Sequence, residues 1–253
     1  MASWNSIETR FHNYTVIIGA QALHATGYAM GMAKDGMVGN ADPADNGCAM
    51  VYFGDGAMSQ GDVNEAFIFA MSYQAPVVFM IMNNQWAISE PVSLQSKIPL
   101  YQRASGFGMP GVQVDGNDVV AMHAVTEWAT RHAREGKGPV MVEAYTYRLG
   151  AHTTSDDPTK YRLREEEEEW RGKDPLDRVE RYLRDKGLID DAYLAQLDEE
   201  GDALGEHLRE ACKTLTEPTM DLAFDNVYIN KPKTLAQQQQ AYAEYAASFE
   251  QEK

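Results

Sequence analysis

Short apolar runs alternate with segments of helical spacing over the first 150 residues, and this alternation predicts strands separated by helices. Two of the runs stop abruptly, at Gly54 and at Asn83, as buried strands do. Strands this apolar indicate an α/β fold, in which a parallel sheet has helices on both faces. The predicted strands are residues 48–53, 77–82 and 140–147, and the predicted helices are residues 22–34, 59–73 and 119–134.

Two of these helices support more specific expectations. The first has alanines and glycines at four-residue spacing, which predicts close packing on a neighbouring element. The second is expected to begin at Ser59, because a serine hydroxyl is a good helix cap. Its spacing predicts Phe67, Ile68 and Met71 on one face.

The composition changes near residue 160, from glycine, methionine and branched apolar residues to glutamate, arginine and glutamine. We therefore expect an α/β domain over residues 1–160 and a helical extension over residues 161–253 that packs on the same domain. The five consecutive acids Glu165–Glu169 are interpreted as a solvated helix face. The helices predicted in the extension are residues 177–186, 191–204, 206–215 and 234–251.

The charge of the chain excludes some classes of partner. Its 253 residues have a formal net charge of −16, which repels nucleic acid phosphates and anionic membranes. No apolar stretch approaches the roughly 20 residues of a membrane span, and the first residues have no apolar signal core. The two cysteines are too few for a disulfide framework or a cysteine metal cluster. We expect a cytoplasmic protein that binds neither nucleic acid nor membranes.

Candidate chemistry lies just past the ends of two predicted strands. Gly54, Asp55, Gly56 and Ala57 follow the first, and Asn84 follows the second, 29 positions after Asp55. The carboxyl edge of a parallel sheet is where ligands bind, and a crossover helix brings the two strands near each other. Carboxylate, amide, carbonyl and phosphate oxygens suit Mg²⁺ or Ca²⁺. The glycines allow close approach of a phosphate to the backbone.

Competing interpretations of this segment fit less well. A dinucleotide-binding fingerprint requires glycine where the chain has Ser59, and a phosphate-binding loop requires lysine where it has Asp62. The plainest alternative is that the two segments are ordinary tight turns. The paired asparagine at the end of the second strand argues against that alternative.

Three longer motifs resemble one family. Residues 54–62 (GDGAMSQGD) and 83–91 (NNQWAISEP) resemble the thiamine diphosphate motif, and residues 147–162 (YRLGAHTTSDDPTKYR) add a third block. Together they are similar to the alpha subunit of the decarboxylating first component of 2-oxo acid dehydrogenase complexes, of the pyruvate and branched-chain types. The similarity runs from about Thr15 to the C-terminus, and it implies the thiamine diphosphate-binding fold.

The resemblance implies a role for each matching residue. Asp55, Asn84 and the main-chain carbonyl of Trp86 would bind Mg²⁺, and His152 would lie over the reacting carbon of the cofactor as the catalytic residue. We expect the loop around His152 to be mobile without cofactor, because its charged residues have no obvious local partners. The implied cofactor-binding residues are Ile18, Gly54, Asp55, Gly56, Ala57, Asn84, Trp86 and His152. The implied loop-ordering residues are Arg148, Asp156, Tyr161 and Arg162.

The function that the resemblance implies is thiamine diphosphate-dependent oxidative decarboxylation of pyruvate, with transfer of the acyl group to lipoamide. The implied partners are a beta subunit, in a heterotetramer of two alpha and two beta chains, and a lipoyl-bearing acyltransferase core. One alternative is the same reaction on branched-chain 2-oxo acids, and another is a truncated, non-catalytic assembly partner. A single-chain decarboxylase or transketolase is disfavoured, because the His152 loop resembles this family more closely.

The chain departs from the family pattern in three respects. Met82 stands where some branched-chain relatives have an arginine that contacts the diphosphate. Family alpha subunits have roughly another third of chain before this one begins, and that part supplies a tyrosine–arginine pair to the diphosphate. Thr153 stands where animal relatives have a regulatory serine. Because the diphosphate would lack the arginine and the tyrosine–arginine pair, and because the resemblance implies that the beta subunit activates the aminopyrimidine, we expect the chain alone not to turn over substrate.

Overall fold

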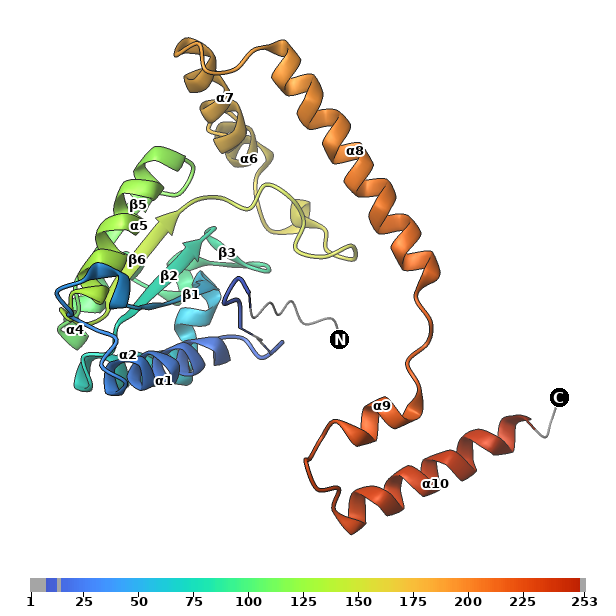
Figure 1. Cartoon of the computed structure of the whole chain (residues 1–253). Helices are drawn as coiled ribbons and strands as arrows, with labels where there is room; N and C mark the ends of the chain where they lie inside the picture. The colour runs from blue at the N-terminus through green and yellow to red at the C-terminus, as the bar shows by residue number, and fades with distance from the viewer. Residues whose placement is uncertain (1–7, 13–14, 251–253) are drawn as a thin grey trace. The chain divides into compact units, whose positions relative to one another are not determined.

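The computed structural model describes residues 8–12 and 15–250 (Figure 1). The chain divides into two compact units, Met1–Leu188 and Ile189–Lys253, and each is described by itself. This division falls after the change of composition near residue 160. The organisation into functional regions 1–160 and 161–253 stays a prediction.

A four-stranded parallel sheet forms the centre of the first unit, in the order β1-β2-β6-β5. Its strands are β1 (Ala49–Gly54), β2 (Val77–Asn83), β5 (Gly111–Asp115) and β6 (Val140–Tyr145). The three predicted strands are confirmed to within two residues at each end. Strand β5 was not predicted, because it is a short edge strand in which only two of five residues are apolar.

Helices cover both faces of the sheet, as predicted (Figure 1). Helices α1 (Ala20–Lys34) and α2 (Gly61–Ser72) share one buried cluster with β1 and β2, in which Phe67 and Phe79 meet edge to face with ring centroids 4.8 Å apart. Helix α5 (Val119–Arg134) covers the other face through Ala129 and Ala133. The bounds of α5 agree with the prediction, and the Asp118 carboxylate caps its first turn.

Two finer predictions about α2 are wrong, and one about α1 is confirmed only in part. Helix α1 packs on α2 and β1 through Ala22 and Ala29, which are fully buried, but a Cβ at Gly27 or Gly31 would meet nothing within 4 Å. Ser59 does not cap α2, because residues 55–59 form a 3₁₀ turn and its hydroxyl bonds the Gln95 side chain at 3.3 Å instead. Ile68 is 53% exposed, whereas its neighbour Phe67 is fully buried. One residue of helix turns the side chain by about 100° and so away from the sheet.

Short elements join the strands of the first unit. Residues 83–110 form a two-stranded hairpin and three short helical pieces, and the segment after β6 continues as a loop into two helices. These elements are η1 (Pro43–Asp45), η2 (Asp55–Ser59), β3 (Trp86–Ala87), β4 (Glu90–Pro91), α3 (Val92–Gln95), η3 (Leu100–Arg103), α4 (Ala104–Phe107), η4 (Pro158–Lys160), α6 (Arg164–Arg171) and α7 (Pro175–Asp185).

The second unit is entirely helical in the part that the structure describes: α8 (Asp191–Thr214), α9 (Met220–Asp225) and α10 (Lys233–Glu250). The prediction of separate helices over 191–204 and 206–215 is wrong, because α8 passes through Gly205 without a break. One glycine costs a helix only about 1 kcal/mol relative to alanine, which a helix of 24 residues tolerates. Helices α9 and α10 pack through Phe224 and Tyr242. Among the described helices, none has the length and apolar character needed to cross a bilayer.

Candidate functional site

The three sequence motifs meet at the carboxyl edge of the sheet. Strands β1, β2 and β6 are neighbours, and the register pairs Gly54 with Met82 and Asn83 with Tyr145, so that the strands end at the same level. Directly after these ends come the turn η2, the turn 83–86 and the loop 146–163. The predicted adjacency of the first two strands is therefore confirmed.

The Asp55 carboxylate lies at the centre of this edge. It is only 2% exposed, and its Oδ2 accepts a hydrogen bond of 3.3 Å from the Gln95 side chain. Burial raises the pKa of Asp55, although hydrogen bonds from the main chain of Asp55 and of Asn84, and the charge of Arg148, act in the opposite direction. The structure thus brings Asp55 and Asn84 together, and leaves a buried carboxylate that a bound cation would stabilise.

The segment after β2 forms a tight turn. The Asn84 side-chain oxygen accepts a hydrogen bond from the Trp86 main-chain N–H at 3.1 Å, and Gln85 has a φ of 71°, in the left-handed region. Glutamine rarely adopts that conformation, so its surroundings must enforce it. The turn holds the Asn84 amide and the buried Trp86 at the same edge as Asp55.

Gly56 brings the two turns into contact. A Cβ at this position would lie 2.8 Å from the Cβ of Ala87 in β3, so only glycine fits there. At Gly54 an added Cβ would meet nothing within 4 Å, and the neighbouring Ala57 is buried. Close packing therefore explains the second glycine of the motif and not the first.

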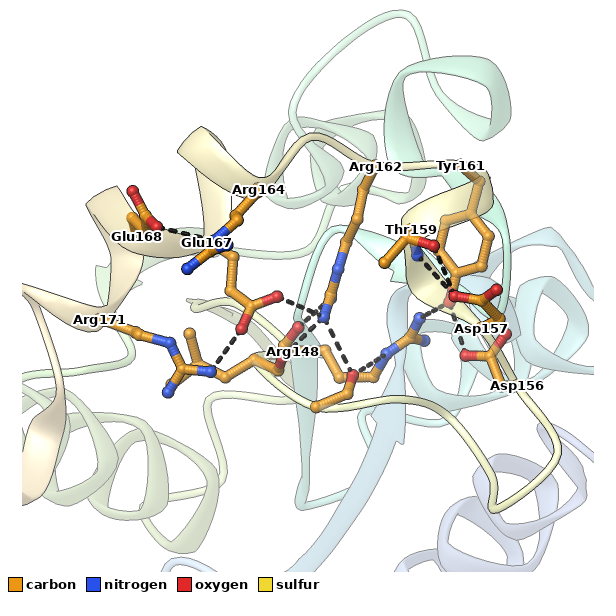
Figure 2. A network of polar contacts seen from close by, with 12 residues as sticks. Arg148, Asp156, Asp157, Thr159, Tyr161, Arg162, Arg164, Glu167, Glu168 and Arg171 are labelled. Carbon is orange, nitrogen blue, oxygen red and sulfur yellow. Dashed lines mark hydrogen bonds and ion pairs between the residues drawn. The ribbon is translucent and has the colours of Figure 1, made fainter.

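Arg148 joins the loop after β6 to the turn after β2. Figure 2 shows Arg148 beside Tyr161 and Asp156 in the loop. Its Nη1 donates to the Trp86 carbonyl at 3.0 Å, and its Nη2 donates to the Ile88 carbonyl at 2.6 Å and to the Tyr161 hydroxyl at 2.9 Å. The Tyr161 hydroxyl in turn donates to Asp156 Oδ2 at 2.6 Å. This bond, as the largest cause, lowers the pKa of Asp156.

Arg162 closes the base of the same loop (Figure 2). Its side chain is buried, and it donates to the carbonyl oxygens of Arg148 and of Leu149, the latter at 2.6 Å. It also forms an ion pair of 3.2 Å with Glu167, which pairs with Arg171 as well. The interpretation of residues 165–169 as a purely solvated face is therefore wrong at Glu167.

His152 lies at the exposed tip of this loop. Its main-chain N–H donates to Asp156 Oδ2 at 2.8 Å, while its imidazole makes no hydrogen bond to any residue that the structure describes. Thr153 is also exposed, and its hydroxyl lies 3.2 Å from that of Ser155. The expectation that the charged loop residues lack local partners is wrong, because Asp156 and Arg148 are held by several contacts.

Ile18 is the predicted site residue with the least support from the geometry. It is 63% exposed and lies just before Gly19, which precedes α1 with a φ of 85°. A Cβ at Gly19 would lie 2.8 Å from the Val63 side chain, so this segment is close to the start of α2. Ile18 is therefore near the start of α2, with its side chain open to solvent.

Two polar residues at this edge were missed by the sequence analysis. Gln95 bonds Asp55, but it ends the four-residue helix α3, where no pattern indicates a role. Glu143 is a buried acid inside the apolar strand β6, and that isolation is a signal that could have been recognised. Beside Gln95, a shallow polar cavity of about 440 Å³ is lined in part by Ser59, Lys97 and Arg103.

The donors at this edge fit a hard divalent cation. They are a carboxylate (Asp55), an amide oxygen (Asn84) and a main-chain carbonyl (Trp86), a set of oxygens that suits Mg²⁺. The described residues contain no group of three or more His, Cys, Asp or Glu side chains that could hold a metal ion, so this set combines one carboxylate with neutral oxygens. Of the predicted site residues, Asp55, Asn84, Trp86, Arg148, Asp156, Tyr161 and Arg162 are linked to one another by contacts.

Comparisons with known proteins give a consistent result. The family model described as "Dehydrogenase E1 component" matches residues 3–220. A 3-methyl-2-oxobutanoate dehydrogenase subunit alpha from Mycobacterium tuberculosis is 43% identical over 238 residues, which are 92% of this chain and 62% of that protein. A pyruvate dehydrogenase E1 component subunit alpha from Staphylococcus aureus is 40% identical over 232 residues, 90% of this chain and 60% of that protein. The chain thus spans less than two thirds of these relatives.

Proposed function

The chain belongs to the dehydrogenase E1 component family, and from that premise we propose that it acts as the alpha subunit of a 2-oxo acid dehydrogenase. In this proposal it takes part in oxidative decarboxylation of a 2-oxo acid and transfer of the acyl group to lipoamide. One observation supports the proposal above all: the buried Asp55 carboxylate lies beside the Asn84 turn at the carboxyl edge of the sheet.

The proposed cofactors are thiamine diphosphate and Mg²⁺. Asp55, Asn84 and the Trp86 carbonyl would hold Mg²⁺, because they provide hard oxygen donors at one edge. When bound, thiamine diphosphate supplies the electron sink that decarboxylation of a 2-oxo acid requires. Gly54, Gly56 and Ala57 would present the backbone to the diphosphate, and Ile18 would border the aminopyrimidine ring.

The residues of the loop have separate proposed tasks. His152, with an exposed imidazole free of hydrogen bonds to the described residues, would act as the acid or base near the reacting centre. Arg148 positions the Trp86 carbonyl, and Asp156 fixes the main chain of His152. Tyr161 and Arg162 hold Arg148 and the loop ends in place.

Pyruvate is the proposed substrate, and branched-chain 2-oxo acids are the alternative. The relatives include both types by name. Met82, which is 44% exposed at the end of β2, offers no charge where some branched-chain relatives are expected to have an arginine. That difference favours pyruvate, whereas the slightly higher identity to the branched-chain relative favours the alternative.

The proposed partners are a beta subunit, in a heterotetramer of two alpha and two beta chains, and a lipoyl-bearing acyltransferase core. The outer face of α2 supports a partner, because Ile68, Phe69 and Tyr73 are exposed there. We propose that the assembly is cytoplasmic. A non-catalytic assembly partner remains the competing proposal, since the chain spans 62% or less of the relatives described above.

Reconstitution tests the proposal. The chain would be co-expressed with a beta chain of the same family and supplied with thiamine diphosphate and Mg²⁺. Decarboxylation of pyruvate and of 3-methyl-2-oxobutanoate would be followed with an artificial electron acceptor, with His152→Ala as the matched inactive control. Turnover of one substrate at least tenfold above the other would assign the substrate. Equal background rates for wild type and control on both substrates would favour the non-catalytic partner.

A further inference from the structure

Glu143 is a buried carboxylate that none of the proposed chemistry uses. It lies on β6, between β2 and β5, and its side chain is only 1% exposed. Among the ion pairs of the described residues, none includes it. Burying a carboxylate without a cation is costly, so its hydrogen bonds must compensate for the lost hydration.

Each oxygen of Glu143 accepts one hydrogen bond. The Asn83 side-chain Nδ2 donates to Oε1 at 2.6 Å, and the Tyr101 main-chain N–H donates to Oε2 at 2.9 Å. Asn83 is itself only 2% exposed, and it is the last residue of β2. Glu143 therefore determines which way the Asn83 amide group faces.

The other end of that amide holds the turn. The Asn83 Oδ1 accepts a hydrogen bond of 3.0 Å from the Gln85 main-chain N–H. Gln85 is the residue with a φ of 71°, and it separates Asn84 from Trp86. The Asn83 amide thus accepts from the Gln85 N–H with its oxygen and donates to Glu143 with its nitrogen, so the direction of both hydrogen bonds is fixed.

We propose that Glu143 is a positioning residue for the magnesium turn, defined as residues 83–86. It acts through Asn83, whose oriented amide holds Gln85 in its left-handed conformation and so aims the Asn84 amide and the Trp86 carbonyl at the ion. The proposal rests on the proposed function, because that function places Mg²⁺ at this turn.

The polarity of the contacts makes the proposal testable. In Glu143→Gln the new amide can accept from Tyr101 with its oxygen, but its NH₂ then faces the NH₂ of Asn83. If Asn83 turns over to accept from the new amide, its own NH₂ faces the Gln85 N–H. Either arrangement leaves two donors opposed. Adding Asn83→Asp removes the conflict, because the new carboxylate accepts from both the amide at position 143 and the Gln85 N–H.

The experiment compares wild type, Glu143→Gln, Asn83→Asp and the double variant, each with its beta partner. Glu127→Gln, which removes an exposed acid on α5, is the matched control. Binding of Mg²⁺ with thiamine diphosphate is measured by titration calorimetry, and amide exchange of residues 83–88 is measured without cofactor. We expect each single variant to bind roughly tenfold more weakly and to exchange faster. In the double variant, the affinity for Mg²⁺ with thiamine diphosphate and the amide exchange rate should each return to within about threefold of the wild-type value.

Three outcomes would overturn the proposal. Wild-type affinity and exchange in Glu143→Gln would show that the turn does not depend on the carboxylate. If the double variant lost binding and its free energy of unfolding fell by a matching amount, Glu143 would stabilise the fold without positioning the turn. Unchanged amide exchange in the single variants would show that the hydrogen bonds from Glu143 do not hold the turn, whether or not wild type binds Mg²⁺. If wild type bound no Mg²⁺, that result alone would contradict the proposed function and not the role of Glu143.

Discussion

The guanidinium group of Arg148 donates a hydrogen bond to the main-chain carbonyl oxygen of Trp86 at 3.0 Å. Arg148 follows β6, whereas Trp86 follows β2, so the bond connects two of the segments that the sequence motifs singled out. The carbonyl is also one of the proposed Mg²⁺ ligands. A carbonyl oxygen has two lone pairs, so it can accept from Arg148 and still face an ion.

Replacement of Asp55 should remove metal-dependent cofactor binding. Asp55→Asn keeps the shape of the side chain, yet it removes the charge that the cation needs. We expect affinity for thiamine diphosphate with Mg²⁺ to fall at least about 10- to 100-fold, the cost of one or more charge-assisted contacts. Titration calorimetry of the assembled enzyme measures this. Unchanged affinity would refute the assignment of the metal site.

Replacement of His152 should separate binding from chemistry. His152→Ala removes an exposed imidazole with no described hydrogen bond, so most of the cofactor affinity should remain. Acyl transfer should fall by roughly 10²–10⁴-fold, the range for a positioned acid or base. The measurement is acetylation of a lipoyl domain by the assembly. His123→Ala, at an exposed histidine on α5, should leave the rate unchanged.

Tyr161→Phe should loosen the loop around His152. The substitution removes the hydroxyl that donates to Asp156 and accepts from Arg148. Amide exchange of residues 148–162 should become faster, and acyl transfer should decrease about tenfold, as expected for one or two lost hydrogen bonds. Because the aromatic ring remains against Trp86, unfolding should change little. A rate and an exchange pattern equal to wild type would show that the network does not order the loop.

The same hydroxyl should make the loop sensitive to acid. The Tyr161 hydroxyl bond holds the pKa of Asp156 below its usual range. A carboxyl with a lowered folded-state pKa stabilises the fold above its unfolded pKa, and this contribution is lost as the pH falls through the folded-state value. NMR titration should therefore show the Asp156 pKa rising toward normal in Tyr161→Phe. The protection of the loop amides in wild type, corrected for the intrinsic pH dependence of exchange, should fall as the pH drops through the folded-state pKa of Asp156. An Asp156 pKa that is equal in wild type and Tyr161→Phe would show that the Tyr161 hydroxyl does not lower it.

Without a beta partner the chain should not turn over substrate. Met82 provides no charge to the diphosphate, and the base that activates the aminopyrimidine is expected from the partner. The assay is decarboxylation of pyruvate and 3-methyl-2-oxobutanoate by the purified chain with saturating cofactor. A rate near one per second, which is within the usual range of enzymes, would refute the requirement for a partner.

The sequence predicted those parts of the fold in which one pattern dominates. Strand β2 is a continuous apolar run, and α5 begins at a capping aspartate and keeps helical spacing to Arg134. Strand β5 and the continuity of α8 could not be predicted in the same way. An edge strand with two apolar residues has a weak pattern, and a glycine such as Gly205 weakens a helix without ending it.

Part of the candidate site could also be predicted from local sequence patterns, and part could not. Asp55 and Asn84 could be paired from the sequence, because both follow buried strands and strand order brings them together. Gln95 and Glu143 reach the site across 40 and 60 positions of chain, to Asp55 and Asn83. Such contacts depend on the path of the connecting loops, which local patterns do not specify.

The contact of Arg162 with the carbonyls of Arg148 and Leu149 makes the intervening residues a closed ring. A segment tied at both ends can change its own length or sequence at small entropic cost, since loop closure depends only weakly on length. Neither β6 nor α6 need shift when the tip around His152 is altered. Residues 151–160, which include His152 and Asp156, can therefore take a different path while the strand and the helix on either side keep their places.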